Sequence, residues 1–147
     1  MEGIIFIIVA AVSGLAMAIQ GSLNSVLGKV VGQLEATFVV HIIATVLVAL
    51  LLFALSLGKG DWSQLAEAPW YTYLGGLLNV IILYGVIYSI PHLGVANATT
   101  AIVAGQVLTA VLVDHFGLFG LEKIEFHWIQ LVGLLLLAVG VKLLYVK

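Results

Sequence analysis

The stretch Asn97–Gly120, NATTAIVAGQVLTAVLVDHFGLFG, decides the fold class. Its part up to Val113 is apolar enough to form a helix that crosses a lipid bilayer. At about 100° per residue, one side of this helix carries only small residues, namely Gly94, Ala98, Ala101 and Gly105. Such a strip lets another helix approach closely within lipid. We therefore predict a membrane-crossing helix with a packing face.

Polar side chains flank this strip, with Asn97 and Thr100 on one side and Gln106 on the other. The segment ends at Asp114, just before a turn rich in glycine. A crossing helix with amides along it and an acid at its end indicates the wall of a transport pathway. Hydrogen bonds between helices, with no transport, would also explain these residues.

Composition assigns the chain to the membrane. Hydrophobic residues make up 63% of the 147 residues and charged residues 8%, and the mean hydropathy is +1.27. Soluble domains are about one-quarter charged, so we predict an integral membrane protein. The net charge of −2 argues against nucleic-acid binding. The lack of cysteine excludes disulfides and thiolate sites. We expect no metal, no cofactor and no catalytic residues, because no motif for them is visible.

Five apolar stretches are each close to the roughly 20 residues that a helix needs to cross the hydrocarbon core. They cover about 3–27, 36–57, 70–90, 95–113 and 128–145. Alternation at period two, which membrane barrels require, is absent. The connecting segments are short. We therefore predict an all-α membrane protein in which residues 1–147 form a single domain of five transmembrane helices.

The first stretch carries two neighbouring stripes. Its small stripe consists of Gly14, Ala18, Gly21 and Ser25, and predicts close helix packing. The other stripe is polar and includes Gln20 and Asn24. These two amides indicate a pathway wall if they face other helices. Alternatively, they lie at the membrane surface and end the helix.

The second and third stretches hold further candidates. His41 lies on a stripe with Thr37 and Thr45, and an ionisable group inside a membrane helix is a functional candidate. It is either a proton carrier near neutral pH or a neutral histidine bonded to backbone. Glu35 precedes it near the helix N-terminus, where the dipole favours a carboxylate. Asn79 gives the third stretch a polar position.

Four residues near the ends of helices bear on the prediction, and three of them have alternative interpretations. Tyr84 and Tyr88 share a helix face, and either stack on a solute or belong to the aromatic belt at the membrane surface. Pro91 is predicted to end the third helix. Asp114 lies at a helix C-terminus, where the dipole disfavours an anion. It is either a compensated acid with a role in proton coupling or an exposed loop residue.

The distribution of lysines leaves the orientation almost unspecified. With five spans, Lys59 and Lys123 share one side of the membrane, and Lys29, Lys142 and Lys147 share the other. Excess positive charge marks the cytoplasmic side. A difference of one lysine therefore hardly specifies the orientation of the chain in the membrane. With an odd number of spans, insertion in both orientations would allow an antiparallel homodimer, which has the inverted repeat that many transporters contain in one chain.

Three segments identify a family resemblance: QGSLNSVLG at Gln20–Gly28, YLGGLLNV at Tyr73–Val80 and GQVLTAVLVDHFGLFG at Gly105–Gly120. Over essentially its whole length the chain resembles the small five-helix branch of the drug/metabolite transporter superfamily, from the bacterial inner membrane. The resemblance implies a transporter that works as a dual-topology homodimer or with an oppositely oriented paralogue. It also marks four positions of interest: Gln20, Asn24, Gln106 and Asp114.

One feature of the better-known relatives is absent. The four-helix multidrug members of the superfamily use a glutamate inside their first helix. This chain has only amides there, and its Glu2 lies at the very end. Competition between drug and protons for a carboxylate in the first helix is therefore not transferred to this chain.

The leading hypothesis is a secondary transporter of a small organic solute, with membrane lipid, the solute and a second chain as its partners. Its pathway is predicted to be lined by Gln20, Asn24, His41, Asn79, Asn97, Thr100 and Gln106. This amide-rich lining favours a neutral or polar metabolite over a bulky cation. If protons drive transport, the available carriers are His41, Glu35 and Asp114. The alternatives are a passive dual-topology channel and a membrane subunit that transports nothing.

Overall fold

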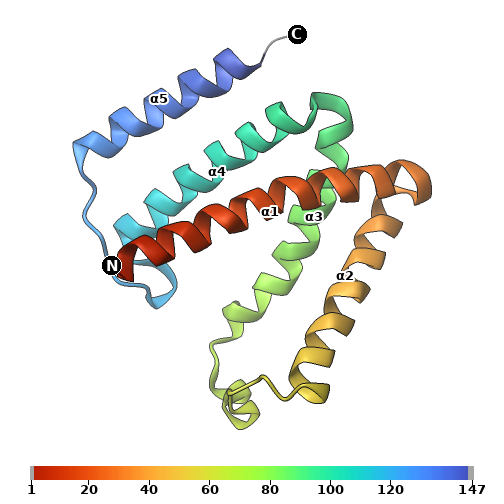
Figure 1. Cartoon of the computed structure of the whole chain (residues 1–147). Helices are drawn as coiled ribbons and strands as arrows, with labels where there is room; N and C mark the ends of the chain where they lie inside the picture. Colours follow the sequence, from red (N-terminus) through yellow and green to blue (C-terminus); the bar gives the residue numbers. More distant parts are fainter. Residues whose placement is uncertain (1, 146–147) are drawn as a thin grey trace. The chain divides into compact units, whose positions relative to one another are not determined.

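The computed structural model describes residues 2–145, and every regular element in that range is a helix. The chain divides into two compact units, of which the first ends at Pro91 and the second begins at His92. The first unit holds α1 (Glu2–Val31), α2 (Gln33–Ala49) and most of α3 (Leu74–Leu93). The second holds α4 (Val95–Phe116) and α5 (Trp128–Leu144), which run side by side (Figure 1).

Four helical segments of the described chain are long and apolar enough to cross a membrane: Gly3–Val31, Gln33–Ala54, Trp70–Leu93 and Val95–Phe116. The fifth, α5, is apolar but has 17 residues. At 1.5 Å per residue it is about 26 Å long, which is near the lower limit for a crossing helix. The all-α class is thereby confirmed for the described residues, and four of the predicted spans coincide with helices that are able to cross a membrane.

The first helix is longer than predicted. α1 has 30 residues and passes through both Gln20 and Asn24, so the interpretation that these amides end the helix is wrong. The helix stops only at Gly32, whose φ of 102° is open to glycine but rare for other residues. The next helix begins directly after it, because the amide of Ala36 donates to the Gly32 carbonyl at 3.0 Å. The predicted connector at 28–35 is therefore one residue.

Small residues of α1 bring α1 and α3 together. A Cβ atom added to Gly28 would lie 2.5 Å from Cγ2 of Ile87 and 3.9 Å from Cβ of Ala36. One added to Gly21 would lie 3.1 Å from Cδ1 of Ile90. Ile87 and Ala36 are fully buried. This contact is close enough that a side chain at Gly28 would have to displace Ile87.

The second span is also displaced from its predicted bounds. α2 continues into a π-helical turn, η1 (Leu50–Ala54), which closes with a bond from the Leu55 amide to the Leu50 carbonyl at 3.0 Å. The helical segment ends at a left-handed residue, Ser56, with φ of 52°. The span therefore covers 33–54 instead of 36–57.

The segment between α2 and α3 contains two short 3₁₀ helices, η2 (Trp62–Glu67) and η3 (Trp70–Tyr73). Asp61 caps η2 by accepting a hydrogen bond from the Ser63 amide at 2.9 Å. Hydrogen bonds from the side chain and backbone of Ser63 hold the pKa of Asp61 below its usual value. Trp62 stacks on Phe53 with ring centroids 6.2 Å apart. Stacked and capped in this way, the loop is an ordered aromatic segment beside the end of α2.

Pro91 does not end α3, which continues to Leu93. A proline in the last turn removes a single amide donor, and the break comes instead at Gly94, with φ of 81°. The Ala98 amide then donates to the Gly94 carbonyl at 3.1 Å, and α4 begins. The predicted connector from Pro91 to Gly94 is reduced to its final glycine.

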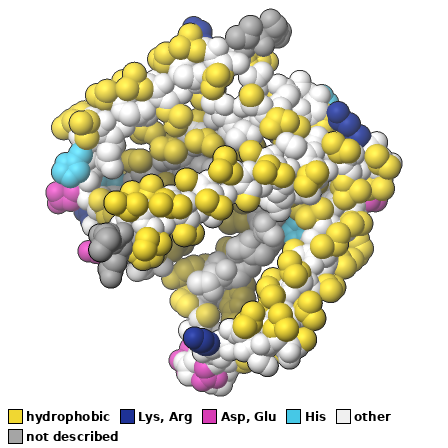
Figure 2. Space-filling model, viewed as in Figure 1, with side chains coloured by type: hydrophobic (Ala, Val, Ile, Leu, Met, Phe, Trp, Pro, Cys, Tyr) yellow, Lys and Arg dark blue, Asp and Glu magenta, His cyan; other side chains and the backbone are white. Residues whose placement is uncertain are grey.

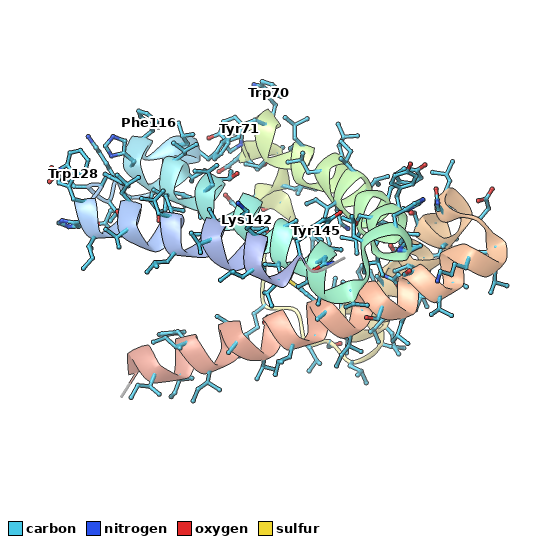
Figure 3. The ribbon with its side chains drawn as sticks, turned by 90° about the horizontal axis from the view of Figure 1, so that it is seen from above. Trp70, Tyr71, Phe116, Trp128, Lys142 and Tyr145 are labelled. Carbon is cyan, nitrogen blue, oxygen red and sulfur yellow. The ribbon has the colours of Figure 1, made fainter. Side chains whose placement is uncertain are left out.

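In the second unit, α4 ends at a left-handed glycine, Gly117, with φ of 59°. The carbonyl of Asp114 accepts the Ile124 amide at 2.9 Å, which ties the loop to the helix end. Figure 3 places Phe116 and Trp128 at the same end of the α4–α5 pair. Polar groups cap the start of α5, where the His127 amide donates to Oε1 of Gln130 at 2.9 Å.

Hydrophobic side chains cover most of the face seen in Figure 2, and charged ones gather in a few groups. On α1, for example, Phe6 is 72% exposed. Such exposure is unfavourable in water and favourable in lipid. The outer surface of the helices therefore fits a hydrocarbon environment.

We expect Gly28→Ala to destabilise the protein by about 1–3 kcal/mol, because the new methyl group overlaps Ile87. Gly14→Ala is the matched control on the same helix, since an added Cβ there meets no atom within 4 Å. Thermal unfolding of the purified protein in detergent measures both. Adding Ile87→Ala should recover part of the loss caused by Gly28→Ala. Equal midpoints for Gly28→Ala and Gly14→Ala would contradict the close contact.

Candidate functional site

The candidate site begins with a polar stripe on α2. Gln33, Thr37, His41 and Thr45 follow one another at intervals of four residues, so they share one face of the helix. The hydroxyl of Thr37 donates to the Gln33 carbonyl at 2.8 Å, and Nδ1 of His41 lies 2.7 Å from the Thr37 carbonyl oxygen. These two bonds fix the side chains against their own helix.

A hydrogen bond between helices joins His41 to α3. Nδ2 of Asn79 lies 3.0 Å from Nε2 of His41. The two residues are 38 positions apart in the chain, and both were predicted to line a pathway. Both also line one cavity of about 390 Å³, together with the apolar side chains of Val48, Leu52 and Phe53. The structure thus brings two of the predicted residues into one site.

A second cavity continues along α2. It has a volume of about 480 Å³ and is lined by Leu34, Glu35, Thr37, Phe38, His41 and Val80. His41 lies on the wall of both cavities, and Glu35 shares this one. The Glu35 carboxylate folds back over Gly32 in the first turn of α2, where the helix dipole favours it. Both volumes lie within the range of small-molecule sites.

A second polar contact between α2 and α3 was not predicted. The hydroxyl of Tyr84 donates to Oε1 of Gln33 at 3.4 Å. Tyr84 also stacks on Tyr88, with ring centroids 6.4 Å apart. The sequence left Tyr84 between a solute-stacking and a belt residue and did not single out Gln33. Gln33 lies four residues before Thr37 on the polar stripe, and this spacing was the sequence signal that could have identified it.

The two amides on α1 differ in their environment. Gln20 is exposed, whereas Asn24 is 7% exposed and its Nδ2 atom has no hydrogen-bond partner among the described residues. Ser25 beside it is 3% exposed. A buried amide donor without a partner costs free energy. Asn24 is therefore a functional candidate, because water, a solute or another helix can supply the missing partner.

The polar residues Asn97 and Thr100 of α4 belong to the second unit and bond to carbonyls four residues earlier in the chain. Nδ2 of Asn97 donates to the Leu93 carbonyl at 3.0 Å, and the Thr100 hydroxyl donates to the Ala96 carbonyl at 2.7 Å. Gln106 is exposed and lines a hollow of about 570 Å³ with its neighbour Gly105. A pathway that joins these residues to those of the first unit stays a prediction.

Asp114 lines the same hollow as Gln106 and is half-buried. The next residue, His115, contacts the rings of Phe116 and Phe126 at centroid distances of 4.9 and 6.2 Å. Nδ1 of His115 is buried and lacks a hydrogen-bond partner among the described residues. These contacts add no support for a role of Asp114 in proton coupling, which stays a prediction.

The predicted packing residues fall into two groups. Gly21 and Ala98 are buried, and Ala18 is half-buried. The others are open: a Cβ added to Gly14, Gly94 or Gly105 meets no atom within 4 Å, and Ala101 is exposed. The small strip of α4 therefore has room for another helix over part of its length. Within residues 2–145, no group of three or more metal-ligating side chains is present.

A double-mutant cycle tests the bond between His41 and Asn79. His41→Leu, Asn79→Leu and the double variant should give a coupling free energy of about 1 kcal/mol, the usual size for hydrogen bonds between membrane helices. Reversible unfolding in mixed micelles, followed by tryptophan fluorescence, measures it. Gln20→Leu paired with His41→Leu is the control and should be additive, because Gln20 is exposed on α1. Additivity of His41→Leu and Asn79→Leu would argue against the bond.

Comparison with known proteins places the chain in a family of membrane exporters. Residues 5–143 match the family described as "Putative inner membrane exporter, YdcZ". No curated protein and no solved structure matches the chain. The match spans nearly the whole chain, confirms the resemblance to a small transporter family and supports membrane transport in place of catalysis. With its membrane-capable helices, the chain belongs to this YdcZ family of multi-pass inner-membrane proteins.

Proposed function

We propose that the chain is a secondary transporter that carries a small, neutral or polar organic solute across the inner membrane. The observation that carries this proposal is the His41–Asn79 bond. It joins an ionisable group to an amide between two membrane-capable helices, and both residues line a cavity of about 390 Å³. Polar and ionisable groups at such positions usually serve a pathway, because lipid solvates them poorly. The family description supports export as the direction.

We further propose that the working unit is an antiparallel homodimer. Three features support it: the near balance of lysines between the two sides, the unpartnered Nδ2 of Asn24 and the open part of the small strip on α4. In such a dimer the solute site lies near the two-fold axis and the membrane midplane. Exchange of conformations between the two copies then alternates access to the site.

The orientation can be measured with two single cysteines, because the chain has no native cysteine. Gly60→Cys lies in the α2–α3 loop, where an added Cβ meets no atom, and Val30→Cys lies at the exposed end of α1. These sites are separated by one membrane crossing. We expect an impermeant thiol reagent to label about half of each population in intact cells, because half of the copies face each way. Full labelling of one site and none of the other would contradict dual insertion.

Transport is tested by counterflow in proteoliposomes. Vesicles loaded with an unlabelled neutral amino acid, hexose or polyol are diluted into the same labelled solute. A carrier accumulates label transiently, whereas a channel only equilibrates it. We expect transient accumulation of at least one solute, accelerated by a pH gradient, and His41→Ala should abolish that acceleration. Empty vesicles and Gly14→Ala are the controls. Equilibration without accumulation would favour a channel, and no flux would favour a subunit that transports nothing.

A further inference from the structure

The two hydrogen bonds of His41 define its protonation. Nδ1 lies 2.7 Å from the Thr37 carbonyl oxygen, which can only accept, so Nδ1 carries a proton. Nε2 lies 3.0 Å from Nδ2 of Asn79, which can only donate, so Nε2 offers its lone pair. With both bonds made in this way, the imidazole has one ring proton, on Nδ1, and the backbone of its own helix holds this tautomer.

This arrangement also fixes what Asn79 offers to the cavity. The hydrogen bond described at Asn79 uses one N–H of Nδ2 and leaves Oδ1 as the acceptor of the side chain, with the second N–H of Nδ2 as a further donor. The cavity that Asn79 shares with His41 is otherwise lined by Ala44, Thr45, Val48, Ala49, Leu52 and Phe53. Apart from the Thr45 hydroxyl, these side chains are apolar. A solute in this cavity therefore meets the amide of Asn79 in a mostly apolar wall.

We propose that His41 controls the hydrogen-bonding polarity of Asn79, which makes Asn79 the specificity-determining residue of the cavity. When His41 is neutral, Oδ1 of Asn79 accepts a hydrogen bond from a hydroxyl or amine group of the solute. When His41 takes up a second proton, this acceptor is withdrawn. The role of the solute rests on the proposed transport function, whereas the link between His41 and Asn79 does not.

The acceptor is withdrawn because a second proton on His41 would place two donors, Nε2 of His41 and Nδ2 of Asn79, opposite each other. One proton from water binds to Nε2 of His41 and turns it into an N–H donor, while Nδ1 keeps its bond to the Thr37 carbonyl. The amide of Asn79 must then rotate by half a turn, so that Oδ1 accepts from Nε2 and Nδ2 takes the former place of Oδ1. A donor on the solute now faces a donor on the protein. Binding of the proton and binding of a donor solute therefore oppose each other.

Few other titratable groups lie near His41. On α2, Glu35 lines the neighbouring cavity with His41, and on α3 the Tyr84 hydroxyl is engaged by Gln33. α1 carries Lys29 in its last turn, before the Gly32 break. The α2–α3 loop carries Lys59, Asp61 and Glu67 beyond the other end of α2. Glu35 is the acid closest to His41 in sequence, and Glu35→Gln therefore serves as a further variant in the titration.

Magic-angle-spinning NMR of the full chain in liposomes tests the switch without a solute. ¹⁵N-labelled histidine, assigned with His41→Gln, should show the Nδ1–H tautomer of His41 at high pH. The side-chain amide signal of Asn79 should then shift with the same pH midpoint as His41, whereas that of Gln106 should not. Glu35→Gln should leave the two midpoints equal to each other. The Nε2–H tautomer at high pH, or a shift of Asn79 independent of His41, would overturn the proposal.

Exchange assays test the specificity. Each solute that the wild-type protein exchanges is compared with its methylated analogue, which lacks the donor. Above the His41 transition we expect about a tenfold preference for the donor form, the size of one hydrogen bond worth about 1.4 kcal/mol. Asn79→Leu should remove this preference at every pH, and Ser89→Ala on the same helix should keep it. An equal preference in Asn79→Leu would overturn the assignment. Absence of any exchange by the wild type would refute the transport function alone, because the NMR result still decides the switch.

Discussion

The close contact between Gly28 and Ile87 is the constraint on which the first unit depends. It draws α3 against α1 at a point where a methyl group on Gly28 would lie 2.5 Å from Ile87. Asn79 lies eight residues before Ile87 on α3, or about 12 Å along the helix, and there it reaches His41 of α2. A larger residue at Gly28 would push α3 away and strain this bond. Small residues in a membrane helix thus position polar ones on other helices.

Polar groups in this chain separate into two classes by their partners. Ser13, Ser22, Thr37 and Thr100 each bond to a carbonyl four residues earlier on their own helix, and Asn97 bonds to the carbonyl of Leu93, the last residue of α3, just before the Gly94 break. Such bonds let a polar residue occupy a membrane helix without any other role. The bonds His41–Asn79 and Tyr84–Gln33 instead join two helices. This distinction weakens the case for Asn97 and Thr100 as pathway residues and strengthens that for His41 and Asn79.

The sequence predicted the helical class and the approximate spans, because runs of apolar residues of bilayer length leave few alternatives. It did not predict the helix ends. Gly32 and Gly94 are each the single residue between two consecutive helices. The sequence does not show which of its glycines will end a helix in this way. His41 and Asn79 were both selected as polar residues in apolar helices. Their contact was beyond prediction, because no periodicity links residues on different helices that are 38 positions apart.

One chain leaves several surfaces incomplete in ways that a second copy would complete. Nδ2 of Asn24 is buried without a partner, and the strip around Gly105 is open although small residues favour close packing. In a dimer with a two-fold axis, each of these features occurs once in each copy. A contact between the copies that completes one of them is therefore formed twice. The lysine balance removes the usual preference for one orientation. The antiparallel pair that we propose would therefore need no second gene product, and the inverted repeat that alternating access requires would arise from a single sequence.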